Sequence, residues 1–192
     1  MGFQLAVIGT SLGGFNALQA VLGDLPRDFP VPIAVVQHRA SEETELFAPL
    51  LATCVQLPVI EAEDKEPIKP GRIFVGPSNY HLLIDGSHFA LSTEAPVMHA
   101  RPSIDVLFES AADCFREGVL GVLLTGMSRD GAAGLKRIKQ HGGFTLVQDP
   151  LTAEGRIMPE AAISTAVANK ILPLEKIASI LTDLCMSQRM RA

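Results

Sequence analysis

The chain has 192 residues, of which 47% are hydrophobic and 19% are charged, and its formal net charge is −5 at pH 7. These totals are typical of one soluble globular domain with a full core, so we expect a single domain over residues 1–192. The negative charge disfavours nucleic acids and anionic membrane surfaces as partners, because both attract basic proteins.

No secretory leader, membrane-spanning apolar run or myristoylation signal is evident. We therefore expect a cytoplasmic protein that does not insert into a membrane. The three cysteines, Cys54, Cys114 and Cys185, are far apart and lack the spacing of zinc ligands. We expect them to be buried thiols, and we expect no metal and no cofactor.

The chain opens with the pattern of a strand, a tight turn and a helix. An apolar run at 5–8 predicts a buried strand, and the apolar spacing from Phe15 to Leu22 predicts a helix. Between them lies Gly-Thr-Ser-Leu-Gly at 9–13, the Gly-x-Ser-x-Gly pattern of a nucleophile elbow centred on Ser11. The amides at the start of the helix would face a developing oxyanion. Two alternatives stay open: a glycine-rich turn that packs closely or binds phosphate, or a serine that only caps the helix.

The next part of the chain predicts further strands and a hairpin. A helix is expected from Ser41, with Leu46, Phe47, Leu50 and Leu51 as its apolar stripe. Asp-Gly at 85–86, between apolar runs at 81–84 and 88–91, is typical of an antiparallel hairpin. The predicted strands lie at 33–36, 59–60 and 72–75.

The second half continues to alternate strands and helices. Ser103 is expected to cap a helix, Pro159 to lie in the first turn of another, and residues 94–101 and 151–158 to form loops. The alternation predicts an α/β fold: a doubly wound, mostly parallel sheet flanked by helices, with one antiparallel β-hairpin. The remaining predicted elements are strands at 121–124 and 144–147 and helices at 132–140 and 174–186.

Three residues suited to hydrolysis follow three of the predicted strands. Ser11 follows the first, His38 the second, and Asp130 lies in the loop after the 121–124 strand. A serine hydroxyl needs a base within hydrogen-bond reach, and the base needs a group that orients it. The carboxyl ends of parallel strands meet at one edge, so these residues can form a Ser-His-Asp triad there. The alternatives are that His38 is a polar strand end and that Asp130 caps the helix after Gly131.

Nucleotide binding fits the sequence less well. A dinucleotide fingerprint requires glycine at 9, 11 and 14 and an acidic residue after the second strand. Position 11 is serine, and the second strand ends at Gln37-His38. The other histidines show no metal spacing; His81 and His88 are expected at the surface of the hairpin, and His141 near a helix C-terminus.

With these residues in place, the sequence resembles the chemotaxis receptor methylesterases, the CheB catalytic-domain family. The resemblance covers nearly the whole chain, and its segments occur in the family's order. They are IGTSLGG at 8–14, VVQH at 35–38, RPSIDVLF at 101–108, LTGMSRDGAAG at 124–134 and MPEAAI at 158–163.

The resemblance implies a protein-glutamate methylesterase that hydrolyses glutamyl methyl esters on the cytoplasmic domains of methylated chemoreceptors. It also implies deamidation of receptor glutamines in many members, and a role in chemotactic signal transduction. Ser11 would be the nucleophile, His38 the base and Asp130 the orienting group. The backbone amides of Met127 and Leu12 would bind the oxyanion, and Arg101 would lie at the rim, facing acidic receptor surface, unless it is only a solvated loop residue.

Two features depart from the family pattern. Leu12 stands where many members have a hydroxyl or other small residue, so only its backbone N–H is available. The usual N-terminal receiver domain is absent from the sequence, so the site would be constitutively open, or a separate regulatory protein would control it, or the chain would be a fragment. The alternative function is a non-catalytic domain that keeps the fold and binds a receptor or signalling protein.

Overall fold

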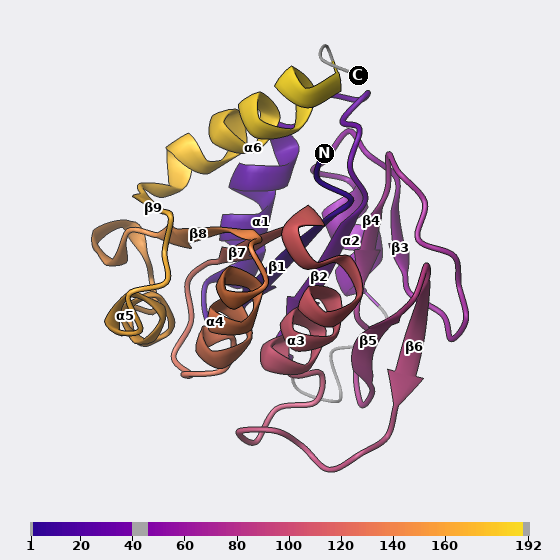
Figure 1. The fold of residues 1–192 in the computed structure, drawn as a ribbon, viewed down its shortest axis with the longest axis horizontal. Helices are drawn as coiled ribbons and strands as arrows, with labels where there is room; N and C mark the ends of the chain where they lie inside the picture. Colours follow the sequence, from indigo (N-terminus) through magenta and orange to yellow (C-terminus); the bar gives the residue numbers. More distant parts are fainter. Residues whose placement is uncertain (1, 40–45, 190–192) are drawn as a thin grey trace.

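The computed structural model describes residues 2–39 and 46–189 and places a seven-stranded parallel sheet between two layers (Figure 1). A separate two-stranded antiparallel sheet lies on one side of it. The α/β fold predicted from the sequence is thereby confirmed. Along the main sheet, the strand order is β3 (Val59–Glu61), β4 (Ile73–Val75), β2 (Ile33–Gln37), β1 (Leu5–Thr10), β7 (Val119–Leu123), β8 (Phe144–Gln148) and β9 (Lys170–Leu172).

The central strand is β1, and all six of its residues are buried. It pairs in parallel with β2 on one side and β7 on the other. Because side chains alternate along a strand, Ala6 and Ile8 face one layer while Leu5 and Val7 face the opposite one. The chain builds the sheet outward from β1 first in one direction and then in the other, which creates a topological switch point beside it.

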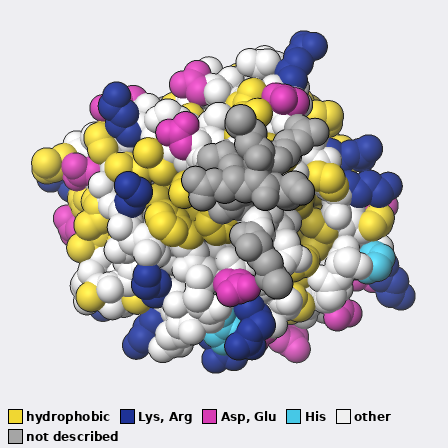
Figure 2. Space-filling view, turned by 45° about the horizontal axis from the view of Figure 1, so that its top comes forward, with side chains coloured by type: hydrophobic (Ala, Val, Ile, Leu, Met, Phe, Trp, Pro, Cys, Tyr) yellow, Lys and Arg dark blue, Asp and Glu magenta, His cyan; other side chains and the backbone are white. Residues whose placement is uncertain are grey.

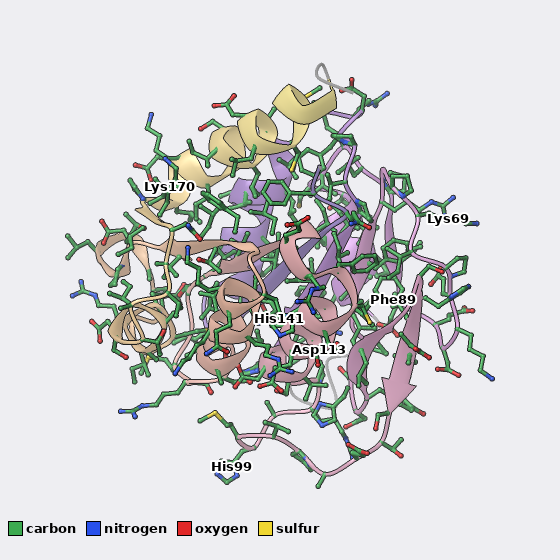
Figure 3. All side chains as sticks on the ribbon, viewed as in Figure 1. Lys69, Phe89, His99, Asp113, His141 and Lys170 are labelled. Atoms are coloured by element: carbon green, nitrogen blue, oxygen red, sulfur yellow. The ribbon has the colours of Figure 1, made fainter. Side chains whose placement is uncertain are left out.

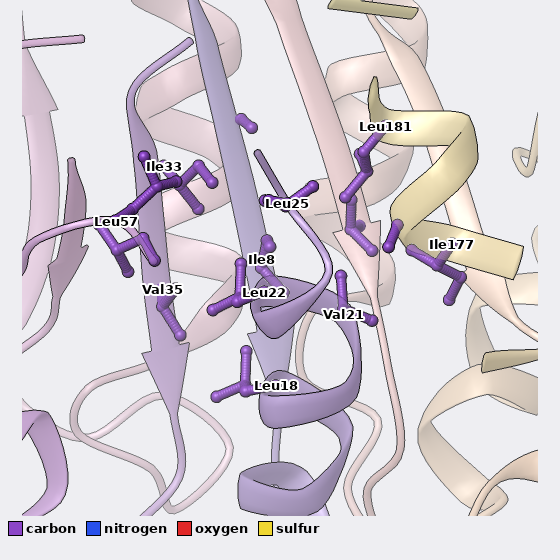
Figure 4. Close-up of a cluster of buried hydrophobic side chains, with 14 of the residues drawn as sticks. Ile8, Leu18, Val21, Leu22, Leu25, Ile33, Val35, Leu57, Ile177 and Leu181 are labelled. Carbon is purple, nitrogen blue, oxygen red and sulfur yellow. The ribbon is translucent and has the colours of Figure 1, made fainter. Parts of the chain in front are cut away.

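One face of the sheet is covered by α1 (Gly14–Gly23), α2 (Phe47–Ala52) and α6 (Leu174–Arg189). Figure 4 shows how this layer packs: Leu22 of α1 lies near Ile8 and Val35 of the sheet, Leu18 lies one turn further along the helix, and Ile177 of α6 lies on the side of Val21. All of these side chains are fully buried. The layer therefore fixes the direction in which α1 leaves the end of β1.

The other face is covered by α3 (Ile104–Phe115), α4 (Ala132–Gln140), α5 (Ile157–Ser164) and the hairpin. Helices α3 and α4 pack closely at Gly134. A Cβ added there would lie 2.5 Å from the Cβ of Phe108 and 3.0 Å from the carbonyl oxygen of Asp105. Short 3₁₀ turns at Arg116–Gly118 and Pro150–Thr152 complete the connections.

The hairpin consists of β5 (His81–Asp85) and β6 (His88–Ser92). Its turn lies one residue later than predicted, because Asp85 pairs with His88 and leaves Gly86 and Ser87 as the loop. Gly86 has φ +57°, a conformation that favours glycine. His88 is exposed as predicted, but the surface prediction for His81 is wrong: its side chain is 2% exposed.

Several other predictions need correction. The predicted start of the second helix at Ser41 lies outside the described residues, and Leu46 and Leu50 of its expected apolar stripe are exposed. The strand β9 was not predicted, because it is a three-residue edge strand without a buried apolar run. Of the three cysteines only Cys185 is buried, where burial raises its thiol pKa to about 12, whereas Cys54 is half-buried and Cys114 exposed.

The surface that Figure 2 shows carries acidic and basic side chains interspersed with hydrophobic ones, and neither sign of charge gathers into a single dominant patch. Within residues 2–39 and 46–189, no helix has both the length and the hydropathy that crossing a membrane requires.

Candidate active site

The carboxyl edge of the sheet brings together the three residues predicted to form a triad. Ser11 follows β1, His38 follows β2, and Asp130 lies in the loop after β7, so they come from the three central strands. The backbone amide of His38 donates to the carbonyl of Thr10 at 3.0 Å, which places the histidine beside the end of β1. This edge, at the switch point, is where ligands bind in open α/β sheets.

Ser11 lies in a tight turn between β1 and α1. Its amide donates to the Thr125 carbonyl at 2.9 Å, and its own carbonyl accepts from Gly14 N at 2.8 Å. The N-cap of α1 is Gly13, at φ +74°, and no side chain caps the helix. The alternative in which Ser11 serves as the helix N-cap is therefore excluded. Its hydroxyl, partly exposed, makes no hydrogen bond within the described part of the chain.

His38 and Asp130 form a close ion-pair geometry. The imidazole Nε2 lies 2.7 Å from Asp130 Oδ2, the aspartate side chain is fully buried, and the histidine side chain is 13% exposed. Because a carboxylate accepts, Nε2 carries the proton and Nδ1 of the neutral ring is left as an acceptor. Ser11 and His38 line the same cavity, of about 450 Å³. The imidazole thus lies at the same edge as the serine, with Nε2 held by Asp130.

Asp130 also fills the N-terminus of α3. Its Oδ1 accepts from the Ser103 hydroxyl at 2.8 Å and from Asp105 N at 3.0 Å, while Oδ2 accepts from Ile104 N at 2.7 Å. Burial alone would raise the pKa of Asp130. The hydrogen bonds from His38 and from the Asp105 and Ile104 amides outweigh burial and hold the pKa below its ordinary value of 3.8. Asp130 does not cap α4, whose N-cap is Gly131.

Gln37 is a residue that sequence reasoning missed. Its side-chain amide donates to the carbonyl of Ser11 at 2.8 Å and to the carbonyl of His38 at 2.9 Å. The side chain is 7% exposed. One amide therefore holds the backbones of both residues together. A polar residue at the end of an otherwise apolar buried strand, directly before His38, was the available signal.

His81 and Ser103 extend the hydrogen-bonded chain away from Asp130. His81 Nδ1 accepts from Ser103 N at 3.2 Å, and its Nε2 faces the Ala95 carbonyl at 3.1 Å. These partners fix a neutral ring with the proton on Nε2. Ser103 caps α3 as predicted, since its hydroxyl accepts from Val106 N. The hairpin and the 94–101 loop are thus tied to the N-terminus of α3.

The backbone amides of Leu12 and Met127 have no hydrogen-bond acceptor within the described residues. Both residues are about half exposed. Hydrogen bonds hold the turn that contains Leu12 against the loop that contains Met127. The Thr125 hydroxyl donates to the Leu12 carbonyl at 2.9 Å and accepts from Gly155 N at 2.7 Å. A Cβ added at Gly126 would lie 2.9 Å from the Cβ of Ser11, so the loop passes directly beside the serine.

The loop after β7 is also joined to the segment before α5. Gly126 N donates to the Gly155 carbonyl at 2.9 Å, and Met158 N donates to the Gly126 carbonyl at 3.0 Å. A Cβ at Gly155 would lie 2.7 Å from the carbonyl carbon of Gly126. The two backbones are therefore in direct contact at this point.

A second cavity, of about 390 Å³, lies on the other side of His38 and is lined by Arg39, Arg101 and Ser128 among others. Arg101 lines this second cavity and not the one that contains Ser11, and its Nη1 donates to the carbonyls of Thr93 and Glu94 at 2.8 and 3.1 Å. Burial lowers the pKa of Arg39, partly offset by Glu61. Across residues 2–39 and 46–189, no three His, Cys, Asp or Glu side chains gather as a metal site would require.

Comparison with known proteins places the fold and the site in a family. The CheB methylesterase family model matches residues 6–181. The chain belongs to the CheB methylesterase family. The CheB methylesterase catalytic domain of Thermotoga maritima superposes with a TM-score of 0.91 at 34% identity, covering 96% of this chain and all of that one.

CheB relatives of two lengths match the chain. A Leptospira interrogans relative is 44% identical over 185 residues, which are 96% of each chain. A protein-glutamate methylesterase/protein-glutamine glutaminase of Anaeromyxobacter dehalogenans is 45% identical over 181 residues, which are 94% of this chain but 53% of that protein. The CheB resemblance found from the motifs is confirmed, and those motifs lie at the carboxyl edge described above.

Proposed function

We propose that this chain is a serine esterase that hydrolyses glutamyl methyl esters on the cytoplasmic domains of chemoreceptors, giving glutamate and methanol. The observation that carries the proposal is the buried His38–Asp130 pair, at 2.7 Å, beside a serine on an uncapped helix N-terminus. Membership of the CheB family and the names of its relatives support the same substrate class.

The geometry supports a two-step reaction. The Ser11 hydroxyl attacks the ester carbonyl carbon while His38 Nδ1 takes its proton, and Asp130 stabilises the imidazolium through Nε2. The amides of Leu12 and Met127 donate to the oxygen of the tetrahedral intermediate. The intermediate collapses as His38 returns the proton to the departing methanol. Water, activated by the same histidine, then attacks the acyl-enzyme and releases glutamate and free Ser11.

The same groups can act on a glutamine side chain. The amide carbonyl carbon is attacked in the same way, and His38 returns the proton to the departing amide nitrogen, so that ammonia leaves in place of methanol. The relatives' names include protein-glutamine glutaminase, which supports this second activity. Residues 1–192 would form one catalytic domain, and Arg101, which lines the second cavity beside His38, would face acidic receptor surface.

The test is methanol release from a methylated chemoreceptor cytoplasmic fragment, with Ser11→Ala as the matched variant. Wild type should release methanol, and the variant should lose at least about 10³-fold in kcat, the scale of removing a triad nucleophile. Binding of the receptor fragment, measured in parallel, should survive the substitution. Receptor binding by wild type without turnover would instead favour a domain that only binds.

A further inference from the structure

Asp105 is a buried carboxylate that the proposed mechanism does not use. It is the second residue of α3, and its side chain is turned toward α4 rather than toward its own helix. Oδ1 accepts from Gly131 N at 2.9 Å and from Gly134 N at 2.6 Å. Asp105 therefore fills the N-terminus of α4, just as Asp130 fills the N-terminus of α3.

The two aspartates form a crossed pair of helix caps. Asp105 is on α3 and holds α4, while Asp130 directly precedes α4 and holds α3, and the Asp105 amide itself donates to Asp130 Oδ1 at 3.0 Å. Gly131 has φ +97°, and a Cβ there would lie 2.8 Å from Ile104 Cγ2. Glycine thus permits the close approach that brings the α4 amides to Asp105.

We propose that Asp105 is a positioning residue for the esterase reaction: by tying the N-terminus of α4 to α3, it fixes the loop that presents Asp130 to His38. The proposal rests on the proposed function for its kinetic readout. Asp130 and Gly131 are adjacent, so a shift of the Gly131 amide moves the carboxylate that orients the imidazole. A displacement of 1 Å in a catalytic group can cost about 10²-fold in rate.

The surroundings of Asp105 disfavour the charged form of its carboxyl group. The pKa of Asp105 is raised to about 6: burial is the largest cause, the facing charges of Asp130 and Glu109 also raise it, and the Gly134 and Gly131 amides lower it. The charged form of Asp105 is disfavoured at this position, yet Oδ1 accepts two backbone hydrogen bonds at the N-terminus of α4.

Two substitutions separate geometry from charge. Asp105→Asn keeps an acceptor oxygen for the Gly131 and Gly134 amides and removes the charge. Asp105→Glu keeps the charge and moves the carboxylate by one methylene. We expect Asp105→Glu to lower kcat for methyl ester hydrolysis at least about 10-fold with KM nearly unchanged, and Asp105→Asn to stay within about 3-fold of wild type.

The matched control is Asp113→Asn, near the far end of α3. Asp113 also ties α3 to α4, through Arg137 at 2.9 Å, with His141 nearby (Figure 3), but it is half exposed and remote from Asp130. This variant should leave kcat and KM unchanged. Equal losses in Asp105→Glu and Asp113→Asn would overturn the proposal, because any contact between the helices would then suffice.

A second readout separates this proposal from the proposed function. Ser11 labelling by a fluorophosphonate probe reports on the nucleophile and base without any receptor substrate. Slow labelling in folded Asp105→Glu and near-normal labelling in Asp105→Asn would support the positioning role even if wild type released no methanol. Wild-type labelling and kcat in Asp105→Glu, or a loss above about 10-fold in folded Asp105→Asn, would contradict it.

Discussion

The N-termini of α1 and α3 lie at the same edge of the sheet, and they are treated in opposite ways. That of α3 is filled by an internal anion, Asp130, together with the Ser103 hydroxyl. That of α1 has glycine as its N-cap, and no side chain within residues 2–39 and 46–189 makes a hydrogen bond to its first amides. Both helix ends attract negative charge. The N-terminus of α3 holds a permanent carboxylate, and in the proposed mechanism the N-terminus of α1 receives the charge that forms during the reaction.

The largest loss of activity should come from removing the carboxylate at the N-terminus of α3. Asp130→Ala removes the partner of His38 and the acceptor of three donors at α3. We expect kcat to fall about 10³-fold or more and the free energy of unfolding to fall by about 3 kcal/mol. Ester turnover and chemical denaturation measure the two losses.

Asp130→Asn is the control for that experiment. It keeps the volume and one acceptor oxygen, but its NH2 group cannot accept from Ile104 N, so it should recover only part of the stability. It should not recover the activity, because an amide does not hold the same histidine tautomer. Wild-type turnover in either variant would show that the anion at α3 belongs to the fold alone.

A smaller loss of activity should come from placing a carboxylate at the N-terminus of α1. Leu12→Asp places a carboxylate beside the amides proposed to bind the oxyanion, and Leu12→Asn is its uncharged match. Repulsion between the two negative charges at about 6 Å costs about 2 kcal/mol, which lowers kcat about 30-fold for Asp relative to Asn. Equal rates in the two variants, compared by steady-state kinetics, would mean that no oxyanion forms near residue 12.

The N-terminus of α4 is filled by Asp105, and the titration of this carboxyl group should make the stability depend on pH. The pKa of Asp105 is raised from 3.8 to about 6 in the folded protein. The folded state therefore binds the proton more tightly, and the free energy of unfolding falls as pH rises through that window. Relative to Asp105→Asn, wild type should be about 2 kcal/mol less stable at about pH 7.5 than at about pH 4.

The contribution of Asp130 has the opposite sign, because its pKa is lowered. Asp130 is present in both proteins, so the difference between them reports the titration of Asp105 together with its coupling to the Asp130 charge. Denaturant titrations at the two pH values make the measurement, and parallel stability curves for wild type and Asp105→Asn would disprove the assignment.

The sequence predicted the strands that place the site, because buried parallel strands read as continuous apolar runs and all six residues of β1 are buried. It could not predict that Asp130 caps α3 rather than α4. That role depends on residues 103–105 and 130 meeting in space, which no local pattern contains. His81 was misplaced for a similar reason: alternation puts it outside the hairpin, but the 94–103 segment covers it.

The direct contact between Gly126 and Gly155 has a dynamic consequence. The loop after β7 and the segment before α5 share the bonds from Gly126 N to Gly155 O and from Met158 N to Gly126 O. Neither segment can open without breaking the other's hydrogen bonds, so the amide protons of Gly126, Gly155 and Met158 belong to one cooperative exchange unit. The Met127 amide, which follows Gly126 in the chain, is then held in place by Gly155 and Met158, about thirty positions further along.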